Sequence, residues 1–292
     1  MLLEKLSKIY KTYNIRKKNG EFRPISHPSK PLKAIQRWLS KSLFSNFPIH
    51  ESATAYRKGK NIKHNATLHS NTKFTLRIDF RNFFPSFDAQ SIYEFILNNS
   101  QNSGLELTNE DAVFATFICT KDGFLTIGAP SSPIITNTMM HDFDETLFEF
   151  CKINNIIYSR YADDLFFSSS KPNSFVGIIE KIQETIANSP ILKLSINHEK
   201  TRYLSRRYRR SITGLVLTPT NEISIGRSKK REIRTLVYLF KMDLLSGDEI
   251  SRLSGILSYT HSIEPEFLSS IERKYGEDAI SSLFKKKRQS LK

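Results

Sequence analysis

The stretch Tyr161-Ala162-Asp163-Asp164 places two adjacent carboxylates between two apolar runs of the strand type. The residues before it, Ile156-Ile157-Tyr158-Ser159-Arg160, and after it, Leu165-Phe166-Phe167-Ser168-Ser169, are rich in β-branched and aromatic side chains. This pattern predicts a β-hairpin with acids at its tip. Close carboxylates raise each other's pKa, so a positive partner such as Mg²⁺ is expected. An ordinary polar turn, in which Asp is favoured for backbone reasons, is the alternative for this stretch alone.

A third carboxylate changes the interpretation of the hairpin. Asp79 ends a predicted strand over Thr72 to Asp79, in which apolar and polar side chains alternate. One carboxylate at a strand end and two on a neighbouring hairpin can converge at one sheet edge. The sequence therefore predicts a two-metal site suited to in-line phosphoryl transfer.

Composition and charge indicate a globular protein with a polyanionic partner. The 292 residues are 39% hydrophobic and 25% charged, which allows one large domain or two to three subdomains. A formal net charge of +15 favours nucleic acid as the partner. Residues 1–60 hold fourteen Lys or Arg against three Glu, and residues 200–234 hold eleven against two. A solvated basic surface without a partner is the alternative.

The same chain is expected to be cytosolic, with both thiols reduced. No apolar run reaches the roughly 18 residues of a membrane span, and Met1-Leu2-Leu3-Glu4-Lys5 lacks the features of a secretion signal. Cys119 and Cys151 have no metal-site spacing, so both are expected to be packing residues.

The remaining pattern predicts an α+β protein with an antiparallel sheet and a helical tail. No internal repeat, low-complexity tract or Gly/Ser linker divides the chain. Asn109 and Ser132 are expected to be helix N-caps. Helices are expected at residues 35–47, 89–98, 109–118, 134–150 and 175–186 and from 228 onward, and further strands at 194–196, 211–217 and 222–225.

The motifs around the acids resemble those of reverse transcriptases, specifically the bacterial retron type. Tyr161-Ala162-Asp163-Asp164 is similar to the family's palm signature, and Asp79 with Phe83-Phe84-Pro85-Ser86 to its first palm motif. Gly128-Ala129-Pro130-Ser131-Ser132-Pro133 resembles the motif beside the nucleotide pocket, and Leu194-Ser195-Ile196-Asn197-His198-Glu199-Lys200-Thr201 the motif that follows. As an ordered set these motifs are specific, whereas each alone is weak.

Two further elements indicate retrons within that family, and one stretch departs from it. Asn65-Ala66-Thr67-Leu68-His69 resembles the retron Asn-Ala-x-x-His element, and Ile212-Thr213-Gly214 resembles the Val-Thr-Gly element with Ile in place of Val. Leu125-Thr126-Ile127 stands where the family usually has Leu-Pro-Gln. Loss of the Gln puts in question a polar contact beside the nucleotide sugar, and with it the rate or fidelity of synthesis.

The resemblance implies a right-hand polymerase fold with fingers, an antiparallel-sheet palm and a helical thumb. The fingers are expected at residues 1–75 with a further segment near 90–125, the palm at 76–226 and the thumb at 227–292. The resemblance also implies that Asp79, Asp163 and Asp164 are the catalytic carboxylates and bind two Mg²⁺ ions, Asp79 and Asp163 most directly.

A set of nucleotide-binding residues follows from the same resemblance. Arg23 is expected to face the incoming triphosphate, and Phe84 to select deoxynucleotides by excluding a ribose 2′-OH. Lys200 is expected to assist proton transfer to pyrophosphate or to hold the template. From the residues alone, Arg23 is equally a solvated surface side chain, and Phe84 a core aromatic. The predicted residues are Arg23, Phe80, Phe84, Gly128, Ala129, Pro130 and Lys200.

A second set is expected to bind the cognate structured noncoding RNA and the RNA–DNA product. RNA helices are recognised by shape, backbone and 2′-OH groups, which suits a surface rich in Lys and Arg. Asn65 and His69 have an alternative role as local hydrogen-bonding residues of a helix. The predicted residues are Asn65, His69, Arg206, Arg207, Arg209, Arg210, Arg227, Lys229, Lys230, Arg231 and Arg234.

The resemblance implies an enzyme that copies part of its own noncoding RNA into multicopy single-stranded DNA from deoxynucleoside triphosphates. Priming from the 2′-OH of a guanosine, a bacterial cytoplasmic location, an antiphage defence role and a separate effector protein are implied by resemblance alone. The alternatives are a group II intron or diversity-generating reverse transcriptase, and a noncatalytic RNA-binding scaffold. Intact Asp79, Asp163 and Asp164 argue against the scaffold.

Overall fold

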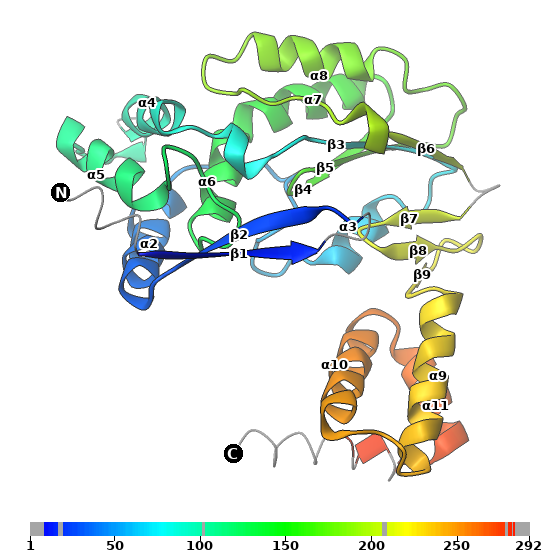
Figure 1. Cartoon of the computed structure of the whole chain (residues 1–292). Coiled ribbons are helices and arrows are strands. Elements are labelled where there is room, and N and C mark those ends of the chain that lie inside the picture. The colour runs from blue at the N-terminus through cyan, green and yellow to red at the C-terminus, as the bar shows by residue number, and fades with distance from the viewer. Residues whose placement is uncertain are drawn as a thin grey trace. The chain divides into compact units, whose positions relative to one another are not determined.

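The chain folds into two compact units, each of which contains helices and antiparallel strand pairs (Figure 1). The computed structural model describes residues 9–16, 20–100, 103–205, 209–277, 280–281 and 283. The first unit comprises residues 1–61 and 72–204, and the second comprises residues 62–71 and 205–292. The predicted α+β class is confirmed. The division into fingers, palm and thumb at residues 75 and 226 does not follow these units and stays a prediction.

The centre of the first unit is a four-stranded sheet in the order β4-β5-β3-β6. β3 (Phe74–Asp79) and β4 (Ile157–Tyr161) both pair antiparallel with β5 (Asp164–Ser169), and β6 (Arg202–Ser205) forms the other edge. β5 is buried along most of its length because Leu165-Phe166-Phe167 packs on both faces of the sheet. The predicted hairpin and the predicted strand that ends at Asp79 are both present.

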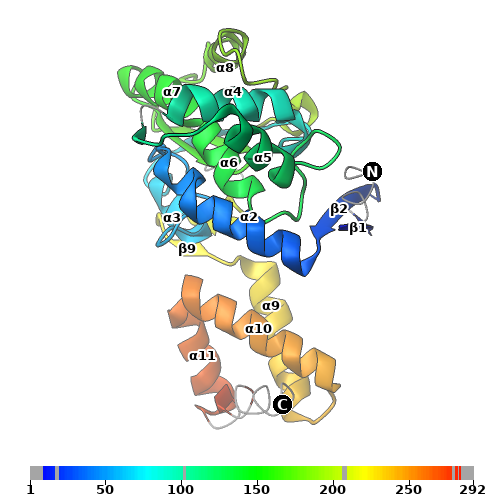
Figure 2. The ribbon, with the colours of Figure 1, turned by 90° about the vertical axis from the view of Figure 1, so that its left-hand side faces the viewer.

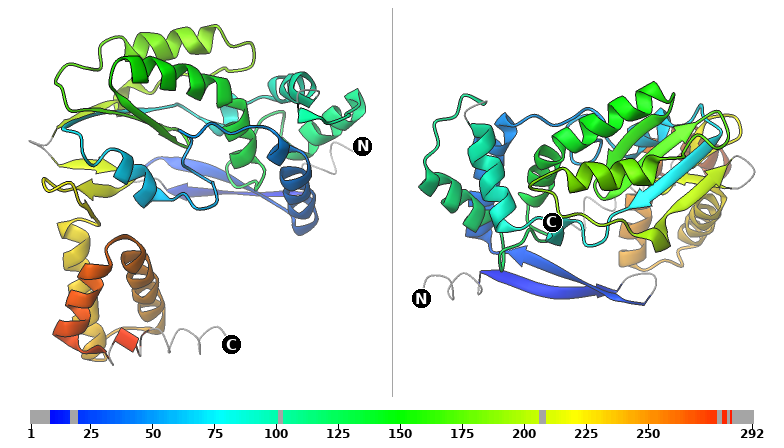
Figure 3. Two further views of the ribbon diagram at one scale, coloured as in Figure 1. Left: turned by 180° about the vertical axis from the view of Figure 1, so that it is seen from behind. Right: turned by 90° about the horizontal axis from the view of Figure 1, so that it is seen from above.

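Helices cover this sheet and extend the core beside it. α7 and α8 lie on one side of the sheet (Figures 1 and 3), and α2, α4, α5 and α6 gather into a second group (Figure 2). The helices are α2 (Lys30–Ser42), α4 (Ala89–Ser100), α5 (Asn109–Cys119), α6 (Ser132–Met139), α7 (His141–Ile153) and α8 (Ile178–Ala187). Short 3-10 turns are η1 (Phe44–Asn46), η2 (Phe84–Ser86) and η4 (His198–Lys200).

Several helix boundaries differ from the sequence expectation. The helix expected over residues 134–150 is two helices, α6 and α7, which change direction at the buried Met140. An apolar pattern that continues through such a bend gives no signal of it. The N-cap of α5 is Thr108 and not Asn109, because Thr108 and Asp111 form a reciprocal capping box. α6 starts at Ser132 itself, so its cap position falls on Ser131.

Two strand expectations in the first unit were incomplete. The strand expected at residues 194–196 is reduced to one isolated bridge between Ile196 and Phe80. The antiparallel hairpin of β1 (Tyr10–Arg16) and β2 (Phe22–Pro28) was not foreseen. Its outer residues are exposed and charged, so the alternation that marks a half-buried strand is weak there.

The second unit joins a small sheet to helices. β7 (Arg210–Ile212), β8 (Leu215–Leu217) and β9 (Ile223–Ser224) form an antiparallel sheet that contacts α3 (Ile62–Leu68). The single strand expected over residues 211–217 is wrong, because the chain reverses at Thr213-Gly214, both with positive φ. The expected helical tail is confirmed and comprises α9 (Arg227–Lys241), α10 (Gly247–Ile263) and α11 (Pro265–Tyr275), which pack together (Figure 2).

Both cysteines lie in the interior. Cys119 and Cys151 are free thiols, as predicted, and burial raises the pKa of each to about 12. Across the residues that the structure describes, no helix has the length and apolar character needed to cross a lipid bilayer.

Candidate active site

The acidic hairpin turns through two residues at the edge of the central sheet. Tyr161 pairs with Asp164 across the hairpin, which leaves Ala162 and Asp163 as the loop. Ala162 has a φ of 57°, in the left-handed region that a side chain with a Cβ disfavours. Surrounding contacts must therefore hold this conformation, as is common where a chain presents a functional group.

Asp79 meets this turn through the sheet register. Asp79 is opposite Asp164, and the backbone N–H of Phe80 donates to the carbonyl oxygen of Asp163 at 3.1 Å. The Asp79 side chain is only 5% exposed. Burial first, and the neighbouring Asp79 carboxylate second, raise the pKa of Asp163 above its usual value. Two buried acids from separate motifs are thus close enough for the charge of one to act on the other.

Asp164 points to a different partner from Asp163. The Arg77 guanidinium donates to both carboxylate oxygens of Asp164, at 2.8 and 3.0 Å from Nη2. Burial is nevertheless the larger influence and raises the pKa of Asp164 to about 6, while Arg77 opposes that rise. Arg77 lies in the same strand as Asp79, and the sequence expectation missed it. The only sequence signal was an Arg inside an otherwise apolar strand.

Lys200 approaches Asp79 from the 3-10 turn η4. Its ammonium nitrogen lies 2.9 Å from Oδ1 and 3.3 Å from Oδ2 of Asp79, and its side chain is 54% exposed. The same turn is fixed by the Asn197 N–H, which donates to the Asp79 carbonyl oxygen at 2.7 Å. A cation already compensates Asp79, so the structure demonstrates directly that this position accommodates positive charge.

Arg23 and the Gly128 loop lie together on one wall of the site. The charge of Arg23 acts on Asp163 and lowers the pKa of that carboxyl against the effect of burial. Gly128 has a φ of 111°, and a Cβ there would come within 2.9 Å of the Ser26 carbonyl oxygen in β2. The Ser26 N–H donates to the Ile127 carbonyl oxygen at 2.9 Å. Only glycine allows the loop to pack this closely on the strand that carries Arg23.

The unusual Leu125-Thr126-Ile127 stretch contributes mainly through its backbone and its packing. Leu125 is 1% exposed, and the Thr126 carbonyl oxygen accepts from the Ser132 hydroxyl at 2.8 Å. These bonds hold the loop before Ala129 and Pro130 without the Gln that the family usually has. The departure therefore removes a side-chain contact and leaves the loop geometry supported.

The two predicted phenylalanines occupy different environments. The Phe80 ring is 2% exposed and packs against Phe83 and Phe143 in the core. A ring buried in this way offers no surface to a nucleotide, and the N–H of Phe80 holds the Asp163 turn. Nucleotide binding by Phe80 stays a prediction. Phe84 lies at the start of η2, half-buried against Phe83. Its proposed selection of deoxynucleotides stays a prediction.

A buried ion pair supports the acidic turn from behind. The side chains of Arg160 and Asp144 are both 0% exposed, and their Nη2 and Oδ2 atoms are 2.6 Å apart. The Tyr158 hydroxyl donates to Asp144 at 2.7 Å, and Arg160 Nη1 donates to the Ala162 carbonyl oxygen at 3.3 Å. Asn137 accepts from the same nitrogen at 3.1 Å. Sequence reasoning missed this network, because Arg160 looked like one polar residue of a strand.

Tyr56 is a further residue that the sequence did not single out. Its φ of 58° is left-handed, and its side chain is exposed. Burial and the charge of Asp163 raise the pKa of the Tyr56 hydroxyl, while Arg23 lowers it. Tyr56 thus belongs to the surroundings of the acidic turn, beside Arg23.

The comparisons with known proteins now decide the family. Residues 15–238 match the family model described as reverse transcriptase (RNA-dependent DNA polymerase). The chain is 38% identical over 282 residues to the retron Ec83 reverse transcriptase of Escherichia coli, covering 94% of this chain and 90% of that protein. It is 32% identical to the retron Ec73 reverse transcriptase of the same organism, covering 92% and 87%.

The chain belongs to the retron reverse transcriptases. It is accordingly an RNA-directed DNA polymerase. Solved structures support the polymerase fold. The telomerase of Candida albicans, solved with a fragment of telomeric RNA, is similar with a TM-score of 0.51 at 11% identity. That match covers 96% of this chain and 63% of the telomerase.

The RNA-binding residues predicted for this reverse transcriptase divide into buried and exposed groups. Asn65 and His69 are 0% exposed, and Arg210 is 2% exposed. Arg210 donates to the His69 carbonyl oxygen at 2.9 Å. These three side chains fill the contact between α3 and β7, so direct contact with RNA is contradicted by their burial. The retron Asn-Ala-x-x-His element instead builds the interior of the second unit.

The basic residues of the retron chain's α9 are partly engaged within the protein. Lys230 pairs with Glu264, and Lys229 pairs with Glu232 at 3.0 Å. Arg227, Arg231 and Arg234 are exposed, and so is Arg209 before β7. Arg206 and Arg207 lie outside the described residues. RNA binding by the exposed arginines stays a prediction.

The acidic groups of this reverse transcriptase fit a divalent cation. Asp79 and Asp163 supply hard oxygen donors, and their negative charge is only partly compensated by Lys200 and Arg23. Mg²⁺ prefers one or two carboxylates together with substrate phosphate oxygens. Within the described ranges, no cluster of three or more His, Cys, Asp or Glu side chains has the geometry of a metal site. Asp79 and Asp163 are the pair that would hold the ion most directly, and metal binding by Asp164, which Arg77 contacts in this structure, stays a prediction.

Proposed function

We propose that this reverse transcriptase copies part of a cognate structured noncoding RNA into multicopy single-stranded DNA. The observation that carries the proposal is the likeness, over nearly the full chain, to proteins named retron reverse transcriptases, joined to the facing pair Asp79 and Asp163. Synthesis begins at the 2′-OH of a guanosine in the RNA and leaves a 2′–5′ branch. The products act in antiphage defence with a separate effector protein, in the bacterial cytoplasm.

Each residue of the site has a part in the proposed polymerisation. Asp79 and Asp163 would hold two Mg²⁺ ions, which supply charge stabilisation to the attacking and leaving oxygens. Arg23 orients the triphosphate of a deoxynucleotide through its planar donors. Lys200, whose ammonium already lies on Asp79, is close enough to the acids to donate a proton to pyrophosphate.

The surroundings of the acids exclude water and fix their positions. Asp79 is buried, and Phe84, five residues after it, is half-buried and would lie beside the sugar of the incoming nucleotide. Such a ring would clash with a ribose 2′-OH and so favour deoxynucleotides. The Arg160 guanidinium holds the Ala162 carbonyl and thereby the direction of the Asp163 side chain. Preorganised charges in a site of this kind lower the barrier without later rearrangement.

The test begins with expression of the protein together with its genomic neighbourhood. Nucleic acid that copurifies should contain a covalent RNA–DNA species, which is shortened by a 2′–5′ debranching enzyme. The matched control is Asp163→Asn/Asp164→Asn, which should yield the RNA without DNA. DNA that is metal-dependent but unbranched would support an intron or diversity-generating type of enzyme, and absence of DNA from the parent would contradict the proposal.

A further inference from the structure

The stretch between β3 and the Gly128 loop has a charge opposite to that of the whole chain. Residues 82–120 contain five Asp or Glu and no Lys or Arg, although the chain carries a formal net charge of +15. This stretch includes α4 and α5. Binding of nucleic acid depends on Lys and Arg contacts to phosphate. The residues of α4 and α5 themselves supply none of these cations.

Helix α5 is apolar on two opposite sides. Its inner side packs in the core through Ala112, Ala115 and Ile118. Its outer side carries Val113, which is 56% exposed, and Phe114, which is 49% exposed. An amphipathic surface helix normally turns polar residues outward. No described part of the chain covers Val113 and Phe114, so this second side lacks a partner.

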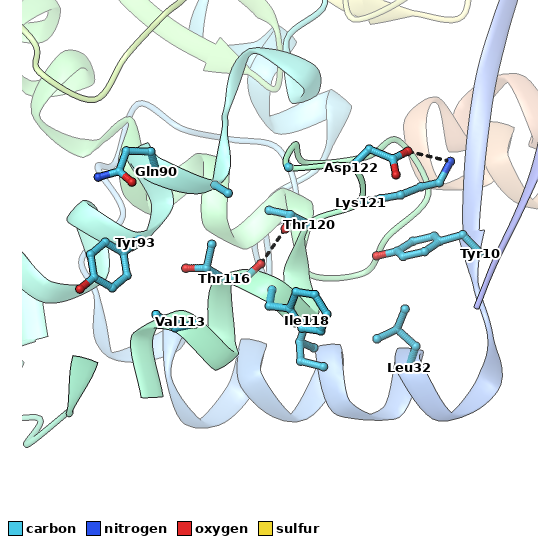
Figure 4. Close-up of a pocket in the computed structure, with 13 residues that line it drawn as sticks. Tyr10, Leu32, Gln90, Tyr93, Val113, Thr116, Ile118, Thr120, Lys121 and Asp122 are labelled. Atoms are coloured by element: carbon cyan, nitrogen blue, oxygen red, sulfur yellow. Dashed lines mark hydrogen bonds and ion pairs between the residues drawn. The ribbon is translucent and has the colours of Figure 1, made fainter. Parts of the chain in front are cut away.

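Two hollows flank this outer side and join along it. One hollow of about 560 Å³ lies between α5, α4 and β1, with Tyr10, Tyr93 and Val113 in its wall (Figure 4). A shallower hollow of about 370 Å³ is lined by Val113, Phe114, Phe117 and the first residues of α5. Val113 and Phe117 border both hollows. We call these two adjoining hollows, with the exposed side chains of Val113 and Phe114, the α5 groove.

The rim of the α5 groove is acidic. Glu110 lies at the start of the groove, one helical turn before Val113 and Phe114, and it is exposed. Glu106 and Asp111 are exposed nearby, and Glu94 on α4 is half-buried. Lys121 in the groove wall is held by Asp122 at 3.6 Å and donates to the Thr12 hydroxyl at 3.1 Å. The rim therefore attracts positive charge.

We infer that the α5 groove is a docking site for an amphipathic helix of a separate protein, with apolar residues on one side and Lys or Arg at its edges. Aromatic and aliphatic anchors in an apolar groove provide affinity, and the complementary charges provide orientation and speed of encounter. The inference goes beyond DNA synthesis and does not rest on the proposed function.

Binding of a defined peptide to the full chain, stripped of nucleic acid, tests the inference. The probe is a labelled helical peptide with a Leu stripe and Lys flanks, and fluorescence anisotropy measures its Kd. Phe114→Ser and Glu110→Lys should each weaken binding by about tenfold. Val176→Ser and Glu180→Lys are matched controls at exposed positions in and beside α8, and they should leave the Kd within about twofold. DNA synthesis should be unchanged in all four variants, since none touches the acidic site.

Two further measurements, one of peptide charge and one of self-association of the chain, can overturn the inference. A peptide with Glu in place of every Lys should bind at least about tenfold more weakly. Equal affinity for the two peptides, or equal loss in the α8 controls, would overturn the inference. If sedimentation shows that the chain dimerises and that Phe114→Ser makes it monomeric, the occupant is a second copy and the separate-protein proposal is also overturned.

Discussion

Two buried aspartates near strand β4, Asp144 behind it and Asp163 in the turn at its end, differ in how their charge is compensated. Behind the strand, Asp144 receives Arg160 and Tyr158 and is fully compensated by the chain itself. At its tip, Asp163 faces Asp79, and burial with like charge raises its pKa. A carboxylate that only supports the fold is neutralised internally. A buried carboxylate whose negative charge the chain does not fully compensate, such as Asp163, indicates that a bound ligand supplies the missing positive charge.

Replacement of Asp163, the acid without full compensation, should have the largest effect, and that effect is on the rate of DNA synthesis. Asp163→Asn removes a metal-binding charge, so DNA synthesis should fall by on the order of ten-thousandfold, which equals more than about 5 kcal/mol of barrier. The free energy of unfolding should be unchanged or slightly raised, because the folded state already disfavours the charged form of Asp163. Primer extension and denaturant unfolding measure the two quantities. A variant that unfolds easily would show that Asp163 is structural after all.

Removal of Arg160, the cation that compensates Asp144, should destabilise the fold. Arg160→Met leaves Asp144 buried without its partner and should lower the free energy of unfolding by about 3–5 kcal/mol. The double variant Arg160→Met/Asp144→Leu removes both charges and should recover most of that loss in denaturant unfolding. If the double variant is no more stable than the single one, packing and not charge explains the role of Arg160.

His69 is a third buried titratable group, and the folded chain keeps it uncharged and so avoids the need for a compensating charge. Burial first, and Arg210 second, lower the pKa of His69 to about 3 from 6.5. Between these values the unfolded chain binds a proton that the folded chain refuses, so stability is lost as the pH falls below 6.5. The slope attributable to His69 should be about 0.7 kcal/mol per pH unit at pH 6.5 and should approach about 1.4 below pH 5.5. This slope is obtained by subtracting the unfolding free energies of His69→Gln from those of the parent, measured in urea over this pH range. Parallel plots of unfolding free energy against pH would contradict the lowered pKa of His69.

The smallest effect on stability is expected at the half-exposed pair of Lys200 and Asp79. Lys200→Gln should change the free energy of unfolding by less than about 1 kcal/mol, because an exposed ammonium is well solvated. Synthesis should fall about tenfold if Lys200 donates a proton. Lys200→Arg, which keeps the charge but cannot release a proton, is the matched control. Recovery of the parent rate by Lys200→Arg would assign Lys200 to template holding instead.

The sequence was sufficient to predict the strands that carry the acids, but not the arginine side chains that pair with neighbouring aspartates. The strand before Asp79 and the hairpin before Asp163 each follow from local alternation, and their pairing follows from one shared sheet edge. Arg77 and Arg160 could not be assigned in the same way. Each meets its aspartate across strands or across a helix and a strand, and such partners leave no local pattern.

The misplaced elements have physical causes of the same kind. Met139 and Met140 are both buried, and buried apolar side chains continue on each side of the bend at Ile135 and Phe143, so the bend between α6 and α7 leaves little trace in the apolar pattern. The turn at Thr213-Gly214 lies inside the retron element itself, where a short apolar run looks like one strand. Asn65 and His69, which were predicted to bind RNA, are both 0% exposed. Their burial shows that a specific motif can be an interior one.

The inaccessible sulfurs of Cys119 and Cys151 make this protein convenient for labelling. A thiol whose pKa is about 12 carries almost no thiolate near neutral pH, and burial denies access to alkylating reagents and oxidants. These two are the chain's whole complement of cysteine. A single cysteine introduced at exposed Val176 or Tyr203 would then take a maleimide dye alone, without prior removal of any native sulfur. Fluorescence could follow one enzyme molecule through synthesis under ordinary aerobic conditions.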